Sequence, residues 1–239
     1  MNLNLKIEDW LESRISSFRI KNRPFITLAY AQSWDGSITT RCGETLSFSC
    51  KESTELTHQL RSLHDGILVG IGTVLSDDPQ LTVREWSGSN PQPIILDSRL
   101  RTPSDAKVCR HPDKRCWILT VNSDSNILSD CADILTIGSA NKKPNEVPLI
   151  EAMGRLYERG IATLMVEGGG AVITAFIKSQ LVDALVLTVA PNIVGGYKAV
   201  GDLQNSRRNE LFSITPFYSG QAGQDFVVWG GLRYGGNKD

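Results

Sequence analysis

One stretch of the chain combines a carboxylate with a run of glycines, and both could do chemistry. Residues 164–173 read LMVEGGGAVI, in which Glu167 follows an apolar run and three glycines precede a second one. The pattern predicts a strand, a glycine turn and the start of a helix, whose free N–H groups bind phosphate without a cationic side chain. It favours a nucleotide-binding site with Glu167 beside the phosphates, although a tight turn that only packs well has the same pattern.

A second segment places two arginines around another predicted strand and turn. Residues 61–84 read RSLHDGILVGIGTVLSDDPQLTVR, which predicts a helix end, a strand, a glycine turn into a short helix, and a stop at the proline. Arg61 and Arg84 bracket this unit and could clamp a phosphate bidentately. Other interpretations stay open: Arg61 as a solvated helix residue, Arg84 as a charge at a strand edge, and DDP at 77–79 as a turn that stops the helix.

The composition excludes several classes of protein. The chain has 239 residues, 41% of them hydrophobic, and its 25 Lys and Arg against 26 Asp and Glu give a formal net charge of −1. Near-neutrality argues against broad nucleic-acid binding, and no apolar run approaches the roughly 20 residues that span a bilayer. The N-terminal sequence is unlike a secretory signal, so the expected location is the cytoplasm.

Cysteine and histidine usage points away from metal and disulfide chemistry. The five cysteines include no C-x-x-C pair, and the chain lacks the H-x-E and P-C-x-x-C signature of zinc deaminases. We therefore expect no structural metal, no disulfide framework and no deaminase domain. His58 and His64, six residues apart, are interpreted as ordinary helix-face or loop residues.

Periodicity predicts the elements that must position these groups. Helices are expected at 5–18, after a capping box at 49–52, and at 148–160. Besides the strand before the glycine turn, strands are expected at 24–34, 67–71, 93–97, 116–121, 133–137, 185–190 and 226–229. The segments 86–91, 122–130, 139–147 and 201–224 are predicted to be connections.

The order of these elements predicts the fold class. Strands alternate with helices, which is typical of a three-layer α/β/α fold with a mostly parallel central sheet. No strong helix separates the last strands, which predicts an antiparallel edge. We expect a single domain over residues 1–239, with residues 1–22 as an N-terminal helical extension.

Four motifs in this order resemble the pyrimidine reductases of riboflavin biosynthesis. They are YAQSWDG at 30–36, the run at 70–84, DSR at 97–99 and VEGGG at 166–170. The resemblance implies a dihydrofolate-reductase-like fold and an NADPH-dependent reduction of a ribosylaminopyrimidine 5′-phosphate. It further implies that hydride passes from the nicotinamide C4 to ribose C1′ and that the ribosyl group becomes ribityl.

The resemblance also implies which residues form the site. Glu167 and Asp77 would be catalytic, with Glu167 beside the reacting ribose. Arg61 and Arg84 would grip the 5′-phosphate. The implied substrate residues are Thr45, Arg61, Leu81, Arg84 and Glu167. The implied cofactor residues are Ala31, Ser47, Thr73, Asp77, Ser98, Gly169, Gly170, Ala171, Val172, Ile173, Thr174 and Ala175. Arg99 and Arg101 are candidates for the NADPH 2′-phosphate.

Two positions depart from many bacterial members, which have lysine in place of Ala29 and tryptophan in place of Ser47. The YAQS run at 30–33 and HDGILVG at 64–70 look more like fungal and archaeal members. This favours the diamino-pyrimidinone modestly over the deaminated uracil as substrate. The family also implies a homodimer formed through late strands, and a separate deaminase acting in the same pathway.

Two other functions stay open. One is a different reductase of the same fold, such as one that acts on dihydrofolate, although the carboxylate nearest the first strand, Asp35, is predicted to lie in a turn. The other is a nucleotide-binding module without catalysis, which Ala29 and Ser47 would fit.

Overall fold

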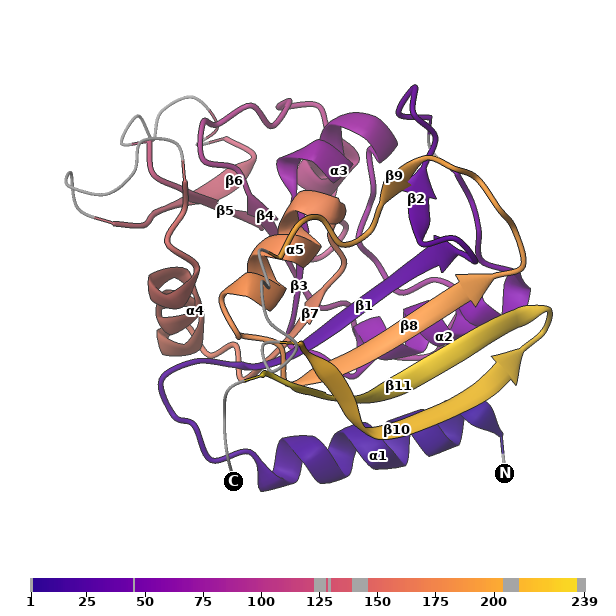
Figure 1. Ribbon diagram of the computed structural model, residues 1–239. Helices are drawn as coiled ribbons and strands as arrows, with labels where there is room; N and C mark the ends of the chain where they lie inside the picture. The colour runs from indigo at the N-terminus through magenta and orange to yellow at the C-terminus, as the bar shows by residue number, and fades with distance from the viewer. Residues whose placement is uncertain are drawn as a thin grey trace.

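The computed structural model describes residues 2–44, 46–122, 128, 130–138, 146–203 and 211–235 (Figure 1). Its main strands are β1 (Phe25–Ser33), β3 (Gly66–Gly70), β4 (Gln92–Leu96), β5 (Cys116–Thr120), β6 (Ala132–Thr136), β7 (Thr163–Val166), β8 (Ala184–Ala190), β10 (Ser213–Ala222) and β11 (Asp225–Arg233). They form one sheet in the order β10-β11-β8-β1-β7-β3-β4-β5-β6. The short strands β2 (Ser37–Thr39) and β9 (Tyr197–Lys198) pair separately.

Strand directions confirm the predicted sheet. From β8 to β6 every neighbouring pair is parallel. At the other edge β11 pairs antiparallel with β8, and β10 pairs antiparallel with β11. The long apolar runs of β1, β3 and β7 follow from this arrangement, because strands of a parallel sheet are buried on both faces.

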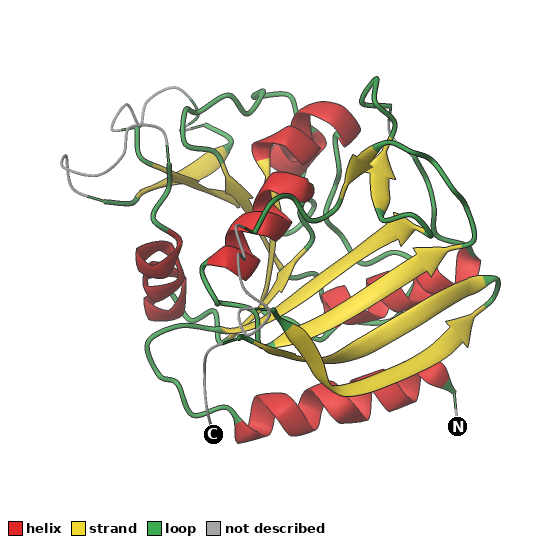
Figure 2. Ribbon diagram, viewed as in Figure 1, coloured by secondary structure: helices red, strands yellow, loops and turns green. Residues whose placement is uncertain are grey.

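Helices cover both faces of the sheet (Figure 2). Helices α1 (Leu3–Ser17) and α2 (Lys51–Ser62) pack on one face, and α4 (Leu149–Glu158) and α5 (Gly170–Lys178) pack on the other. Alternation along β7 decides the faces: Met165 joins the core of α1 and α2, whereas Leu164 and Val166 join that of α4 and α5. The predicted three-layer α/β/α fold is therefore confirmed.

Two shorter helices complete the fold. Helix α3 (Ile71–Asp77) follows β3 directly, and the 3₁₀ helix η1 (Lys107–Arg110) packs in the same apolar cluster. Among the described residues, none of the helices combines the length and the apolarity needed to cross a bilayer.

The sequence predicts a connection over 201–224, of which 204–210 lie outside the described residues. In the described part the structure places strand β10 at Ser213–Ala222. Most of its residues are exposed, because β10 is the outer strand and pairs only with β11. It contains Pro216, beside which the pairing register shifts. Proline and a bulge are typical of an edge strand and hide the alternation by which strands are recognised.

The predicted capping box at 49–52 is wrong. Helix α2 begins at Lys51, and the side chain of its N-cap residue, Cys50, makes no capping bond. The carboxylate of Asp225, at the start of β11, accepts the Cys50 N–H at 2.8 Å and also the Ser53 hydroxyl. The cap therefore comes from the last strand of the sheet.

Replacing Asp225 with alanine should lower the free energy of unfolding by about 2 kcal/mol, because the half-buried Cys50 N–H and the buried Ser53 hydroxyl lose this acceptor. Urea unfolding followed by circular dichroism measures this. Asp225→Asn keeps one carbonyl acceptor and should recover part of the loss. An unchanged unfolding midpoint in Asp225→Ala would show that the cap contributes nothing.

Candidate functional site

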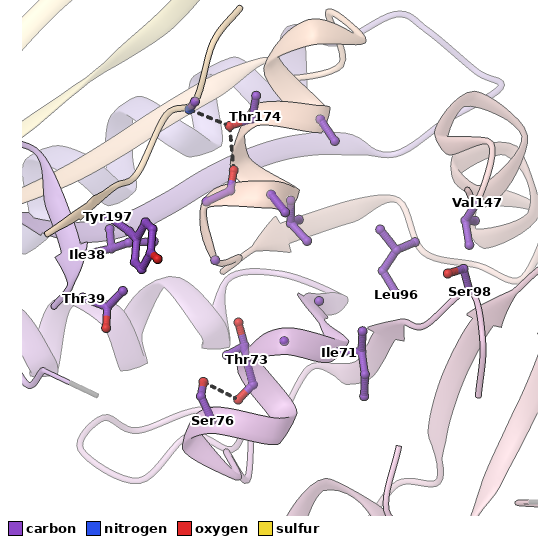
Figure 3. A pocket seen from close by; sticks show the side chains of 18 of the residues that line it. Ile38, Thr39, Ile71, Thr73, Ser76, Leu96, Ser98, Val147, Thr174 and Tyr197 are labelled. Carbon is purple, nitrogen blue, oxygen red and sulfur yellow. Dashed lines mark hydrogen bonds between the residues drawn. The ribbon is translucent and has the colours of Figure 1, made fainter. Parts of the chain in front are cut away.

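A cavity of about 1340 Å³ opens at the carboxyl ends of β3, β4 and β7. Figure 3 shows Thr73 and Ser76 of α3 on one side, Thr174 of α5 on the opposite side, and Leu96 and Ser98 toward one end. Ligands of open α/β sheets bind at this edge of the sheet. The cavity is therefore the candidate cofactor site.

Most of the predicted cofactor residues line this cavity. They are Thr73, Asp77, Ser98, Gly169, Gly170, Ala171, Val172, Thr174 and Ala175. Ala31, Ser47 and Ile173 do not line it, although all three are among the described residues. Ile173 is fully buried in the core between α5 and the sheet, so its side chain holds the helix in place. Of the two arginine candidates, Arg101 lines the cavity and Arg99 does not.

The three glycines of the turn have different roles. Two are required by packing, and one leaves room for a ligand. A Cβ on Gly168 would lie 2.6 Å from the Cβ of Val172, and one on Gly170 would lie 2.9 Å from the Lys198 carbonyl oxygen. At Gly169 the nearest atom would be the Thr73 Oγ1 at 3.5 Å, an ordinary contact. Packing therefore requires Gly168 and Gly170, whereas Gly169 and the first N–H groups of α5, which have no partner inside the helix, suit a phosphate.

The predicted substrate residues that the structure describes, Arg61, Leu81, Arg84 and Glu167, lie beside the cavity rather than in its lining. Arg61, at the end of α2, donates from Nε and Nη2 to the two carboxylate oxygens of Glu167, both at 2.8 Å. Its Nη1 donates to the Thr82 carbonyl oxygen at 2.9 Å. Only 11% of the Arg61 side chain and 18% of the Glu167 side chain are exposed. The interpretation of Arg61 as a solvated helix residue is therefore wrong.

This ion pair favours the charged form of Arg61. Burial alone would lower the pKa of the Arg61 guanidinium, but the charge and hydrogen bonds of Glu167 raise it. Within the described part of the chain, three of the five N–H donors of the guanidinium are used, which leaves two that could bind a ligand. The phosphate contact of Arg61 stays a prediction, and its observed contact is with the acid.

The segment that ends the second motif is irregular, so Arg84 is not at a strand edge. Leu81 has φ 59° and is only 1% exposed as a whole residue, so it has almost no surface with which to contact a substrate. Arg84 donates from Nη1 to the Thr82 Oγ1 at 2.7 Å. Helix α3 ends at Asp77, and Asp78 follows it with φ 43°, as expected for a turn that stops the helix. Thr45 lies outside the described residues.

Sequence reasoning missed both ends of the cavity. Ile38 and Tyr197 of the β2–β9 pair lie toward one end, and Val147, before α4, lies toward the other (Figure 3). Val147 is the last residue of a segment predicted to be a connection, and Tyr197 follows two glycines, so neither carries a local signal of a binding site.

Asp35 holds the β2–β9 pair against the end of β1. Its carboxylate accepts hydrogen bonds from the Lys198 Nζ at 2.7 Å and from the hydroxyls of Ser33 and Ser37 at 2.6 and 2.8 Å. These hydrogen bonds lower the pKa of Asp35, and the bond from Lys198 has the largest effect. Because these bonds occupy the Asp35 carboxylate, it is poorly placed to bind a pterin. Asp35 lies in a turn, as the sequence predicts.

The lowered pKa values of the three histidines should make the stability of the fold depend on pH. Burial is the main cause that lowers the pKa of His58, His64 and His111, and that of His58 falls to about 4. Unfolded histidine titrates near about pH 6.5, so below that pH the unfolded chain binds protons that the native chain does not. The free energy of unfolding should therefore decrease as the pH is lowered from about 7 to about 5. Just above about pH 7 it should not change with pH. Urea titrations across this range measure it, and an unchanged midpoint would contradict it.

Comparison with known proteins identifies the family. A model of the RibD C-terminal domain matches residues 24–221. The 2,5-diamino-6-ribosylamino-4(3H)-pyrimidinone 5′-phosphate reductase of Debaryomyces hansenii is 35% identical over 73% of this chain and 77% of that protein. The protein of the same name from Archaeoglobus fulgidus is 31% identical over 73% of this chain and 83% of that protein. The riboflavin biosynthesis protein RibD of Aquifex aeolicus is 32% identical over 87% of this chain, which spans only 58% of that longer protein.

Solved structures agree with this assignment. The riboflavin biosynthesis reductase Rib7 of Saccharomyces cerevisiae superposes with a TM-score of 0.74 at 26% identity, over 95% of this chain and 99% of that one. RibD of Acinetobacter baumannii has a TM-score of 0.71 at 23% identity, over 89% of this chain and 58% of that one, and shows the fold alone. The chain therefore belongs to the RibD C-terminal domain family of riboflavin-pathway reductases.

Proposed function

We propose that the chain reduces the ribosyl group of a ribosylaminopyrimidine 5′-phosphate to a ribityl group. When bound, NADPH supplies the hydride, which is delivered to ribose C1′. The observation that carries the proposal is one continuous turn: Glu167, held by Arg61, lies two residues before Gly169, which is in the wall of the large cavity. A dinucleotide in the cavity and a sugar at the carboxylate would meet at this turn.

The cavity suits a dinucleotide in shape and charge. Its volume accommodates a ligand of that size, and Gly169 leaves space beside the first turn of α5. Arg101 lines the wall, so we propose that it contacts the 2′-phosphate and favours NADPH over NADH. Asp77 lines the cavity at the end of α3, and we propose that it contacts the nicotinamide or its ribose.

The acid and the arginines have separate roles in this proposal. The Glu167 carboxylate orients a ribose hydroxyl and stabilises the positive charge that develops at C1′. Arg61 keeps that carboxylate in one orientation through a bidentate bond. Arg84 and the spare donors of Arg61 bind the 5′-phosphate. Phosphate binding then supplies energy away from the reacting carbon and positions C1′ at the acid.

We propose the diamino-pyrimidinone as the preferred substrate. The Debaryomyces and Archaeoglobus relatives are named for this compound, and each is covered over more than two thirds of its length. The test is to follow NADPH absorbance with the diamino compound, the deaminated uracil and dihydrofolate. The diamino compound should be reduced fastest. Faster uracil reduction would reverse the preference, reduction of dihydrofolate alone would indicate a different reductase, and NADPH binding without turnover would indicate a nucleotide-binding module.

We also propose a homodimer formed through the late strands. β10 is the outer strand of the sheet, and its Phe217 is 59% exposed. A partner copy would cover such an apolar edge. Light scattering should give about twice the 26.3 kDa mass of one chain, and the monomer mass would contradict the proposal. A separate deaminase of the same pathway stays a prediction.

The glycine turn offers a matched pair of variants. Gly169→Ala has room for its methyl group but narrows the cavity, so it should weaken NADPH binding about tenfold with little loss of stability. Gly168→Ala drives a methyl group into Val172 and should destabilise the fold by about 1–3 kcal/mol. NADPH titrations and thermal unfolding separate the two effects. Unchanged NADPH affinity in Gly169→Ala would place the cofactor elsewhere.

A further inference from the structure

The segment at 81–84 carries two of the proposed substrate residues but has no regular secondary structure. Side chains of α2 hold its backbone instead. The Thr82 carbonyl oxygen accepts from Arg61, and the Arg84 N–H donates to the Nδ1 of His58 at 2.9 Å. Buried backbone groups need partners, and these bonds supply them where no strand does.

The remaining backbone bond comes from the loop that follows. The Val83 N–H donates to the Asn90 Oδ1 at 2.7 Å. Consecutive N–H groups of Val83 and Arg84 thus end on two different side chains, one from the loop and one from α2. The direction in which the Arg84 side chain leaves the backbone is fixed by this pair of bonds.

His58 is built for this contact. It lies on α2 three residues before Arg61, so the two side chains share a helix face, and it is only 3% exposed. Because its Nδ1 accepts the Arg84 N–H, the neutral ring carries its proton on Nε2. Burial, then the charges of Arg61 and Arg84, lowers the pKa of His58, which keeps the ring neutral and Nδ1 free to accept.

We propose that His58 is a positioning residue that fixes the backbone of Arg84 and thereby directs its guanidinium toward the substrate phosphate. The inference rests on the proposed function, because Arg84 has a phosphate to bind only in that reaction. One rigid helix then carries both supports: Arg61 holds the acid, and three residues earlier His58 holds the phosphate-binding arginine. The spacing between acid and phosphate site is set by a single element, as a preorganised site requires.

The test separates positioning from a purely structural role. His58→Leu removes the acceptor, and His58→Asn replaces it with a carbonyl oxygen. Leu56→Ala is the matched control, because Leu56 is a buried residue of α2 in the core that α2 forms with α1. For each variant kcat and KM are measured with the ribosylaminopyrimidine 5′-phosphate and with the same compound lacking the phosphate.

His58→Leu should raise KM for the phosphorylated compound about tenfold, equivalent to about 1.4 kcal/mol, with kcat and the KM for NADPH little changed. The dephosphorylated compound should show no such loss. His58→Asn should restore most of the KM, and Leu56→Ala should lower stability without changing the ratio between the two compounds. Equal losses on both compounds, or an unchanged KM in His58→Leu, would overturn the proposal.

A second measurement distinguishes failure of this inference from failure of the proposed function. Nitrogen NMR of the His58 ring in the free protein should show the Nε2–H tautomer. The Nδ1–H tautomer would overturn the inference even in an active reductase. If the wild-type protein reduces neither pyrimidine, the proposed function fails and the phosphate role of His58 fails with it, while an Nε2–H signal would still confirm the contact with Arg84.

Discussion

Glu167→Gln should lower kcat by about a hundredfold or more while NADPH binding changes by less than about threefold. The substitution keeps the size of the side chain and removes its charge. In the proposed reaction, the positive charge that develops at ribose C1′ then loses the anion that we place beside it. The proposed cofactor contacts lie beyond the acid, at Gly169 and in α5, which line the cavity, and the substitution should not alter them.

The ion pair with Arg61 gives Glu167→Gln a second expected effect, a loss of stability. In Glu167→Gln one amide N–H₂ faces a donor of Arg61, so the bidentate bond cannot form fully. The buried guanidinium is left partly unpaired, which costs stability as well as activity. Thermal unfolding measures the stability cost, and assays well below the melting temperature isolate the catalytic one.

Glu167→Asp is the matched control because it keeps the charge and shortens the side chain by one methylene. It should retain more activity than Glu167→Gln if charge is what the reaction needs. Equal loss in both variants would assign Glu167 to packing and to holding Arg61. A kcat for Glu167→Gln within twofold of wild type would remove Glu167 from the reaction.

The sequence predicts well those parts of the fold that depend on residues close together in the chain. The motif at 164–173 folds as predicted, with β7, a glycine turn and α5 in direct succession. The central strands are recognised by their continuous apolar runs, because both faces of a parallel sheet are buried. β10 fails this test, since an exposed edge strand with a proline lacks both alternation and an apolar run.

The parts that the sequence does not predict depend on distant partners. The Asp225 cap joins α2 to a residue 175 positions away, and Lys198 reaches Asp35 across 163 positions. Neither residue pair has a local pattern, because the sheet order brings them together. The same holds for Arg61 and Glu167, 106 positions apart: each stands in a motif that predicts a site, but neither motif predicts their direct contact.

That contact changes what the two arginines should do when they are replaced. From the motif alone, Arg61→Ala and Arg84→Ala would both chiefly raise KM. Of the two, Arg61 has an acidic partner, and Arg84 has none among the described ion pairs. Arg84→Ala should therefore raise KM about tenfold or more and leave kcat near wild type. An unchanged KM would remove Arg84 from the phosphate site.

Arg61→Ala should instead lower kcat and stability together. It leaves the largely buried Glu167 carboxylate without its counter-charge, a loss of roughly 3–5 kcal/mol for a buried pair. The carboxylate also loses the two bonds that fix its orientation, so kcat should fall by about a hundredfold. Arg61→Lys keeps the charge without the bidentate geometry and should recover stability more than kcat.

The experiment compares kcat, KM and urea unfolding of the two Arg61 variants and Arg84→Ala. It tests one idea: an arginine that orients the acid affects the chemical step, whereas an arginine that binds only the phosphate affects substrate binding. A pure KM effect in a stably folded Arg61→Ala would show that Arg61 serves the phosphate and that Glu167 needs no support.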